Sequence, residues 1–214
     1  DYPVLTAGLV MAPRGVGTMI AMMIVGRVIS RIDPRLIFAF GLSLIAFTLW
    51  EMAYFTTDVS QATIIRTGIV QGLGLGFVFV PLSTVTFATL APRYRTQGTS
   101  LFSLMRNIGS SIGISIVIFL LTRNTAVMHA DLASHVTPFN LGLHMPGRDR
   151  IWDMTTLAGK AALNGEVTKQ ASVIAYANDY LLMMYVALAS LPLALLLSKP
   201  GTARTGAPAA AAAD

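Results

Sequence analysis

The sequence predicts an all-α, polytopic transmembrane helical bundle. Hydrophobic residues make up 54% of the 214 residues and charged residues only 12%, about half of the roughly 25% found in soluble domains. The mean hydropathy is +0.66, and the charges lie between long apolar runs. Too little polar surface therefore exists to cover a soluble enzyme of this size. The absence of cysteine excludes disulfide-stapled domains, cysteine-based zinc sites and thiol catalysis.

Five apolar runs account for the helices that we expect, because crossing a hydrocarbon core of roughly 30 Å takes about 20 apolar helical residues. In order, they cover about residues 5–30, 36–57, 67–92, 99–122 and 178–198. The charges inside these runs are Arg14 and Arg27 in the first, Glu51 in the second and Arg106 in the fourth. The third run is uncharged between Arg66 and Arg93, and the fifth is uncharged after Asp179, near its start, as far as Lys199.

Small residues inside the runs indicate closely packed helices. Glycine and proline recur there, although each would destabilise a soluble helix. Gly72 with Gly76, and Gly109 with Gly113, stand four residues apart, a spacing that lets two helix backbones approach each other. We expect these four glycines at helix–helix contacts. Chance is the alternative for any single pair, because the chain has 18 glycines.

Connector charges predict the orientation of the bundle. Residues 27–35 and 93–95 are basic, whereas residues 56–61 hold one acid and no base. The positive-inside rule then places both basic connectors in the cytoplasm and the N-terminus outside. By the same alternation, we expect residues 123–177 to form an external loop. Residues 199–214, which end in an alanine-rich stretch, are expected to form a disordered cytoplasmic tail.

The expected external loop carries a helical pattern and three histidines. The helical spacing of Val167, Ala171, Ile174 and Asn178 allows the fifth helix to begin before the bilayer. The spacings of His129, His135 and His144 match no metal-ligand pattern, so we interpret them as residues of a solvated loop and expect no metal site.

The number of spans indicates a part of a longer protein. Five spans with an external N-terminus, and an apolar run that opens close behind Asp1 without a signal peptide, make an unusual complete membrane protein. We expect residues 1–198 to be the C-terminal membrane bundle of a transporter whose missing N-terminal half supplies the rest of the mechanism.

The connector between the first two spans resembles the cytoplasmic signature loop of the major facilitator superfamily, which joins a glycine, an acid and basic residues between adjacent helices. Arg31 and Arg35 match its basic positions, with Gly26 before them and Asp33 between them. Ser30 stands where the family has an aspartate. The charge-relay role of that aspartate is therefore not carried over, and the resemblance implies a conformational role for the loop.

Further motifs resemble the fourteen-span drug:proton antiporters of the EmrB/QacA type. They are residues 12–17 in the first span, residues 72–77 with Pro81 in the third, and residues 106–113 in the fourth. This resemblance implies the last five spans of an inner-membrane exporter of lipophilic or amphiphilic compounds, working by alternating access. It implies the proton gradient as energy source, no cofactor, and a periplasmic adaptor and outer-membrane channel as partners.

Polar groups inside or bordering the spans are the candidates for the substrate or proton pathway, because ionisable groups in lipid are costly. They are Glu51, Arg14, Arg66, Arg106, Gln71 and Asn107. Glu51 either carries protons or meets water at the external interface beside Trp50 and Tyr54. The arginines either snorkel to a membrane surface or pair with an acid of the missing half, since no partner for them is evident in this sequence. The amides face a central cavity or bond neighbouring helices.

Other functions remain as alternatives at this point. The chain could serve a major facilitator transporter of another solute, such as an organic anion or a sugar, and arginines lining the cavity would favour an anion. It could instead be a truncated, non-transporting membrane scaffold. The net charge of +5 does not indicate a nucleic-acid partner, because the basic residues are not gathered on one solvated face.

Overall fold

The computed structural model describes residues 4–88, 90–137, 152 and 155–196. These residues form five long helices and no strand: α1 (Val4–Val28), α2 (Pro34–Ala53), α3 (Gln61–Ala88), α4 (Arg95–Ser134) and α5 (Leu157–Leu196). A short 3-10 turn, η1 (Pro92–Tyr94), precedes α4. All five helices are long and apolar enough to cross a membrane. The predicted fold class is thereby confirmed.

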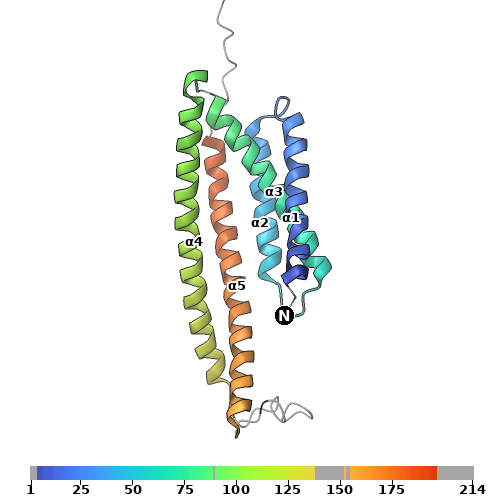
Figure 1. Ribbon diagram of the computed structural model, residues 1–214, viewed down its shortest axis with the longest axis vertical. Coiled ribbons are helices and arrows are strands. Elements are labelled where there is room, and N and C mark those ends of the chain that lie inside the picture. The colour runs from blue at the N-terminus through green and yellow to red at the C-terminus, as the bar shows by residue number, and fades with distance from the viewer. Residues whose placement is uncertain (1–3, 89, 138–151, 153–154, 197–214) are drawn as a thin grey trace, which may run out of the picture.

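The helices form two groups: α1, α2 and α3 pack together, and α4 packs on α5, which also contacts α2 (Figure 1). α3 crosses obliquely and packs against both α1 and α2, while α5 packs against α2 on one side and α4 on the other. α4 and α5 run side by side past the ends of the other helices, on the side where the N-terminus lies. Apart from η1, α4 makes its main contacts with α5 alone, and none of its described side chains is buried.

The stretch expected as an external loop is helical at both of its ends, and the fifth helix does begin ahead of its apolar run, as its spacing allowed. α4 continues to Ser134 and α5 already begins at Leu157, each with 40 residues. At 1.5 Å per residue a helix of that length spans about 60 Å, twice the hydrocarbon core. The charged residues from Arg123 onward leave the apolar run without breaking the helix, because arginine, lysine and glutamate are good helix formers. Residues 138–151, 153 and 154 of this stretch, and the tail expected at residues 199–214, lie outside the described residues.

Glycines set the distance between α3 and its neighbours. A Cβ on Gly72 would collide with the main-chain carbonyl of Arg14, and one on Gly76 would lie 2.5 Å from the Cβ of Ala21. On the other side of α3, a Cβ on Gly74 would lie 3.1 Å from the carbonyl oxygen of Gly41. In lipid no hydrophobic force drives helices together. Close contact between backbones, which glycine permits, therefore supplies the van der Waals packing that holds these helices.

The other predicted glycine pair has a different environment. A Cβ on Gly109 or Gly113 would meet nothing within 4 Å among the described residues. Both lie on α4, whose side chains are largely exposed in the described structure. The close helix contact expected at Gly109 and Gly113 is therefore absent from the part of the chain that the structure describes.

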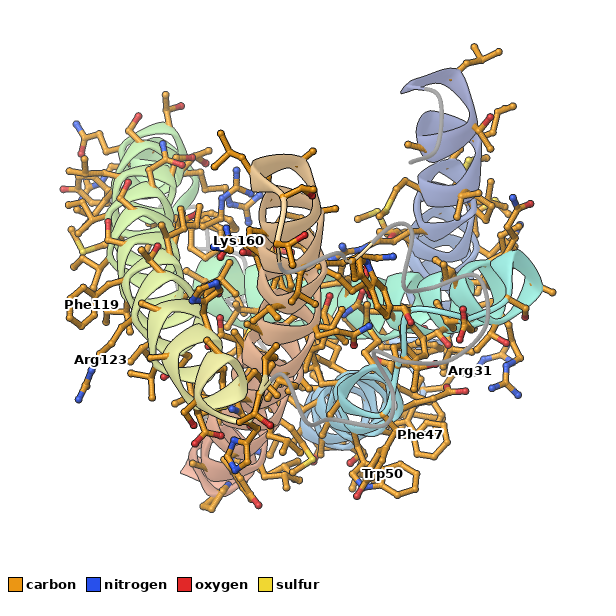
Figure 2. All side chains as sticks on the ribbon, turned by 90° about the horizontal axis from the view of Figure 1, so that it is seen from below. Arg31, Phe47, Trp50, Phe119, Arg123 and Lys160 are labelled. Atoms are coloured by element: carbon orange, nitrogen blue, oxygen red, sulfur yellow. The ribbon has the colours of Figure 1, made fainter. Side chains whose placement is uncertain are left out.

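The basic connector between α1 and α2 is held by local bonds. Asp33 is the N-cap of α2, and its side chain accepts a hydrogen bond of 3.1 Å from the backbone N–H of Arg35. Pro34 follows as the first helical residue, where its missing N–H has no cost. Arg27 donates a bond of 3.2 Å to the carbonyl of Met23. Asp33 thus starts α2, while Arg31 points away from the bundle (Figure 2).

Candidate functional site

A cavity of about 270 Å³ lies between α1, α2, α3 and α5. Its wall is mainly apolar, with Val10, Met11, Leu49, Met52, Ile64 and Met183 among the lining residues. Three polar side chains join them, namely Arg14 from α1, Gln71 from α3 and Tyr180 from α5. An apolar pocket with a few convergent polar groups is the usual form of a small-molecule site.

The packing of α1 on α3 places the first two polar groups. Gln71 is 9% exposed and lies between Gly68, which also lines the cavity, and Gly72. Because Gly72 lets α1 approach, the backbone of Arg14 comes into direct contact with α3 beside Gln71. The structure thus brings together two of the residues selected from sequence.

Glu51 and Arg66 form an ion pair between the outer ends of α2 and α3. The sequence offered no partner for the arginines, and this contact corrects that expectation for Arg66. The arginine side chain is 68% exposed and the carboxylate 21%. The neighbouring Trp50 and Tyr54 are also exposed and pack edge to face at 5.4 Å. Aromatic residues of this kind mark a membrane interface, which favours the interfacial interpretation of Glu51.

The remaining candidates on α4 lie apart from the cavity. Arg106 places its guanidinium 5.9 Å from the ring centre of Phe79 on α3, within the range of a cation–π contact. Asn107 is exposed in the described structure. Neither residue lines the cavity between α1, α2, α3 and α5.

Sequence reasoning missed Asp179 and Tyr180 on α5. Asp179 is 3% exposed, and on the described residues its Oδ2 atom has no hydrogen-bond partner. Ala171 and Ala175 precede it at helical spacing and are fully buried. The helical pattern of Val167, Ala171, Ile174 and Asn178 lies within α5, as expected, although of these four only Ala171 is buried. The spacing of alanine, alanine and aspartate could have indicated the buried stripe.

A second groove of about 520 Å³, to which threonine, serine and histidine side chains contribute, lies between the outer parts of α4 and α5. His129 lines it and hydrogen-bonds Asn164 across the helix pair at 2.9 Å. The ring of His135 contacts the carbonyl of Asp131 at 2.8 Å. His144 lies outside the described residues. Within those residues, no three histidine or acidic side chains gather to hold a metal ion.

Comparison with known proteins agrees with this architecture. Residues 1–128 match the sequence profile of the Major Facilitator Superfamily. The chain is 27% identical over 198 residues to the fatty acid resistance protein FarB of Neisseria gonorrhoeae, covering 91% of this chain and 38% of that protein.

Two further relatives are named for multidrug export or resistance. The chain is 26% identical over 204 residues to the multidrug export protein EmrB of Haemophilus influenzae, covering 93% of this chain and 39% of the relative. It is 27% identical over 206 residues to the probable multidrug resistance protein EmrY of Escherichia coli, with the same two shares. The chain therefore spans about two fifths of the length of these relatives.

Proposed function

This chain belongs to the major facilitator superfamily, and we propose that it forms the C-terminal part of a proton-coupled permease that exports lipophilic or amphiphilic compounds. It is a multi-pass protein of the bacterial inner membrane. Export would proceed by alternating access, as this bundle and the N-terminal half of the permease rock about a site between the two sides of the membrane. We include a periplasmic adaptor and an outer-membrane channel as partners in the proposal.

The cavity is the observation that supports this function best. Apolar side chains from four helices would accept a lipophilic body, while Gln71 and Tyr180 would orient its polar groups. A mainly apolar wall sets few demands on ligand shape, which suits an exporter of many compounds. The names of EmrB and EmrY describe drug export or resistance in those proteins, and this chain aligns with about two fifths of each.

The position of Arg14 favours a second candidate, the export of organic anions. Arg14 lines the mainly apolar cavity, and its permanently charged guanidinium would attract an anionic head group there. FarB is named for fatty acid resistance, and a fatty acid joins a carboxylate to an apolar chain.

A dye-efflux assay on the full-length protein tests the proposal. We expect cells of an exporter-deficient host to expel ethidium faster when they express the protein, and a protonophore to abolish the gain. Gln71→Leu should reduce the efflux, whereas the matched change Gln61→Leu, at an exposed position of α3, should leave it unaltered. Efflux that persists after the proton gradient has collapsed would contradict proton coupling. Loss of fatty acid export with retention of ethidium efflux in Arg14→Met would identify the anion as a further substrate.

A further inference from the structure

Asp179 is the most deeply buried acid in the described part of the chain. Its side chain is 3% exposed, and Oδ2 has no hydrogen-bond partner there. It lies on the buried stripe of α5 behind Ala171 and Ala175, where α5 packs against α2 and α4. An ionised carboxylate in such a position is expensive unless it is paired, while the neutral acid costs far less.

The charged groups on the surrounding helices are directed elsewhere. On α2, Glu51 is engaged by Arg66 of α3. On α4, Arg106 lies over Phe79, and Arg123 points away from α5 (Figure 2). The outer acid of α4, Asp131, lies a turn from its exposed end.

The groups of α1 and α5 near Asp179 connect it with the cavity. Tyr180 follows Asp179 directly and lines the cavity together with Arg14 of α1. The ring of Tyr180 stacks on Tyr176 with 6.5 Å between centroids. The lysines of α5 lie further out, at Lys160 and Lys169. Asp179 is thus a buried carboxyl group one residue from the wall of the substrate cavity.

We propose that Asp179 is the proton-binding carboxyl of this bundle, loaded from the outside and discharged to the cytoplasm during each export cycle. The inference rests on the proposed antiport function and identifies the residue that would bind the proton. One proton forms an O–H bond with the carboxylate when the cavity is open to the outside, which makes the side chain neutral and suited to burial. The same bond breaks when the cavity opens to the cytoplasm, where water can solvate the restored charge.

Two assays on the full-length protein separate proton coupling from substrate binding. The first measures uphill ethidium efflux from energised cells, and the second measures ethidium counterflow in proteoliposomes without a proton gradient. We expect Asp179→Asn to lose uphill efflux down to the level of the uncoupled wild type while it retains counterflow, because the amide mimics the protonated acid. The matched control Asp131→Asn, which changes an exposed acid in the same way, should retain both activities.

The outcomes distinguish this inference from the proposed function. If wild-type efflux ignores the protonophore, the antiport function fails and the inference fails with it. If the wild type depends on the gradient and Asp179→Asn still pumps uphill, only the inference is overturned. If Asp179→Asn loses counterflow as well, Asp179→Glu decides: retained counterflow with a displaced pH profile of uphill efflux supports a proton-binding role. An unchanged profile, or loss of counterflow in both variants, overturns it.

Discussion

Glu51 and Arg66 form an ion pair that connects α2 to α3 at the outer end of the bundle. Arg66 is 68% exposed there, so water and salt screen the pair, and a pair of this kind is worth about 0.2–1 kcal/mol. Neither residue lines the cavity, although Met52 beside Glu51 and Ile64 near Arg66 do. The pair therefore connects α2 to α3 next to the cavity proposed to bind substrate.

We predict that Glu51→Gln retains protonophore-sensitive efflux and lowers stability only modestly, by about 0.2–1 kcal/mol. Thermal unfolding of the purified full-length protein measures the stability, and ethidium efflux measures the activity. The exchange Glu51→Arg with Arg66→Glu should recover most of the lost stability, because it restores opposite charges at the same contact. If Glu51→Gln folds well but loses proton-driven efflux, the result would instead support a role for Glu51 in the proton pathway.

The sequence identified part of this site, and the missing part has a physical reason. Arg14 and Gln71 stood out because polar groups inside apolar runs are rare. The contact of Glu51 with Arg66 joins two helices, and linear spacing carries no information about which outer ends meet. In the sequence Asp179 marks the boundary of an uncharged apolar run, whereas in the structure α5 continues through Asp179 and packs it against other helices.

At the scale of helices, hydropathy located all five elements but not their ends. An apolar run ends where charged residues begin, whereas a helix ends only where its backbone hydrogen bonding ends. For this reason α4 and α5 extend beyond their apolar runs. Glycine spacing located the contact at Gly72 and Gly76. No helix in the described residues packs against Gly109 and Gly113, which have the same spacing. The spacing indicates that two glycines share a helix face, but it does not indicate which helix contacts that face.

The packing of α1 on α3 predicts the effect of enlarging Gly72. In Gly72→Val the new side chain would collide with the backbone carbonyl of Arg14, which cannot move aside as a flexible side chain does. We expect a loss of about 3 kcal/mol, the upper end of overpacking costs, and an altered cavity, because Arg14 and Gln71 line it from the two displaced helices.

Thermal unfolding and the yield of monodisperse protein measure this effect. Gly165→Ala is the matched control, since a Cβ there meets nothing within 4 Å in the described structure. It should be neutral or gain up to about 1 kcal/mol from helix propensity. Equal stability of Gly72→Val and wild type would show that α1 and α3 are not in backbone contact.

At the scale of the whole molecule, the connectors alternate between two ends of the bundle. The connector after α1 and the turn η1 lie at one end, and the connector after α2 lies at the other, beside the N-terminus (Figure 1). The basic residues of the first end belong in the cytoplasm by the positive-inside rule. The long outer parts of α4 and α5, joined by the hydrogen bond of His129 to Asn164, are therefore predicted to project on the external side.

This orientation predicts a pattern of cysteine labelling in the full-length protein. The chain itself contains no cysteine, so single cysteines can be placed at the exposed positions Ser30, Asp58 and Lys169 once any cysteines elsewhere have been replaced. A membrane-impermeant maleimide should label Asp58→Cys and Lys169→Cys in intact cells, because both face the external side. It should label Ser30→Cys only after the membrane has been permeabilised. Labelling of Ser30→Cys in intact cells would show that the bundle has the opposite orientation. Absence of labelling at Lys169→Cys would show that the outer part of α5 lies inside the bilayer or beneath a partner protein.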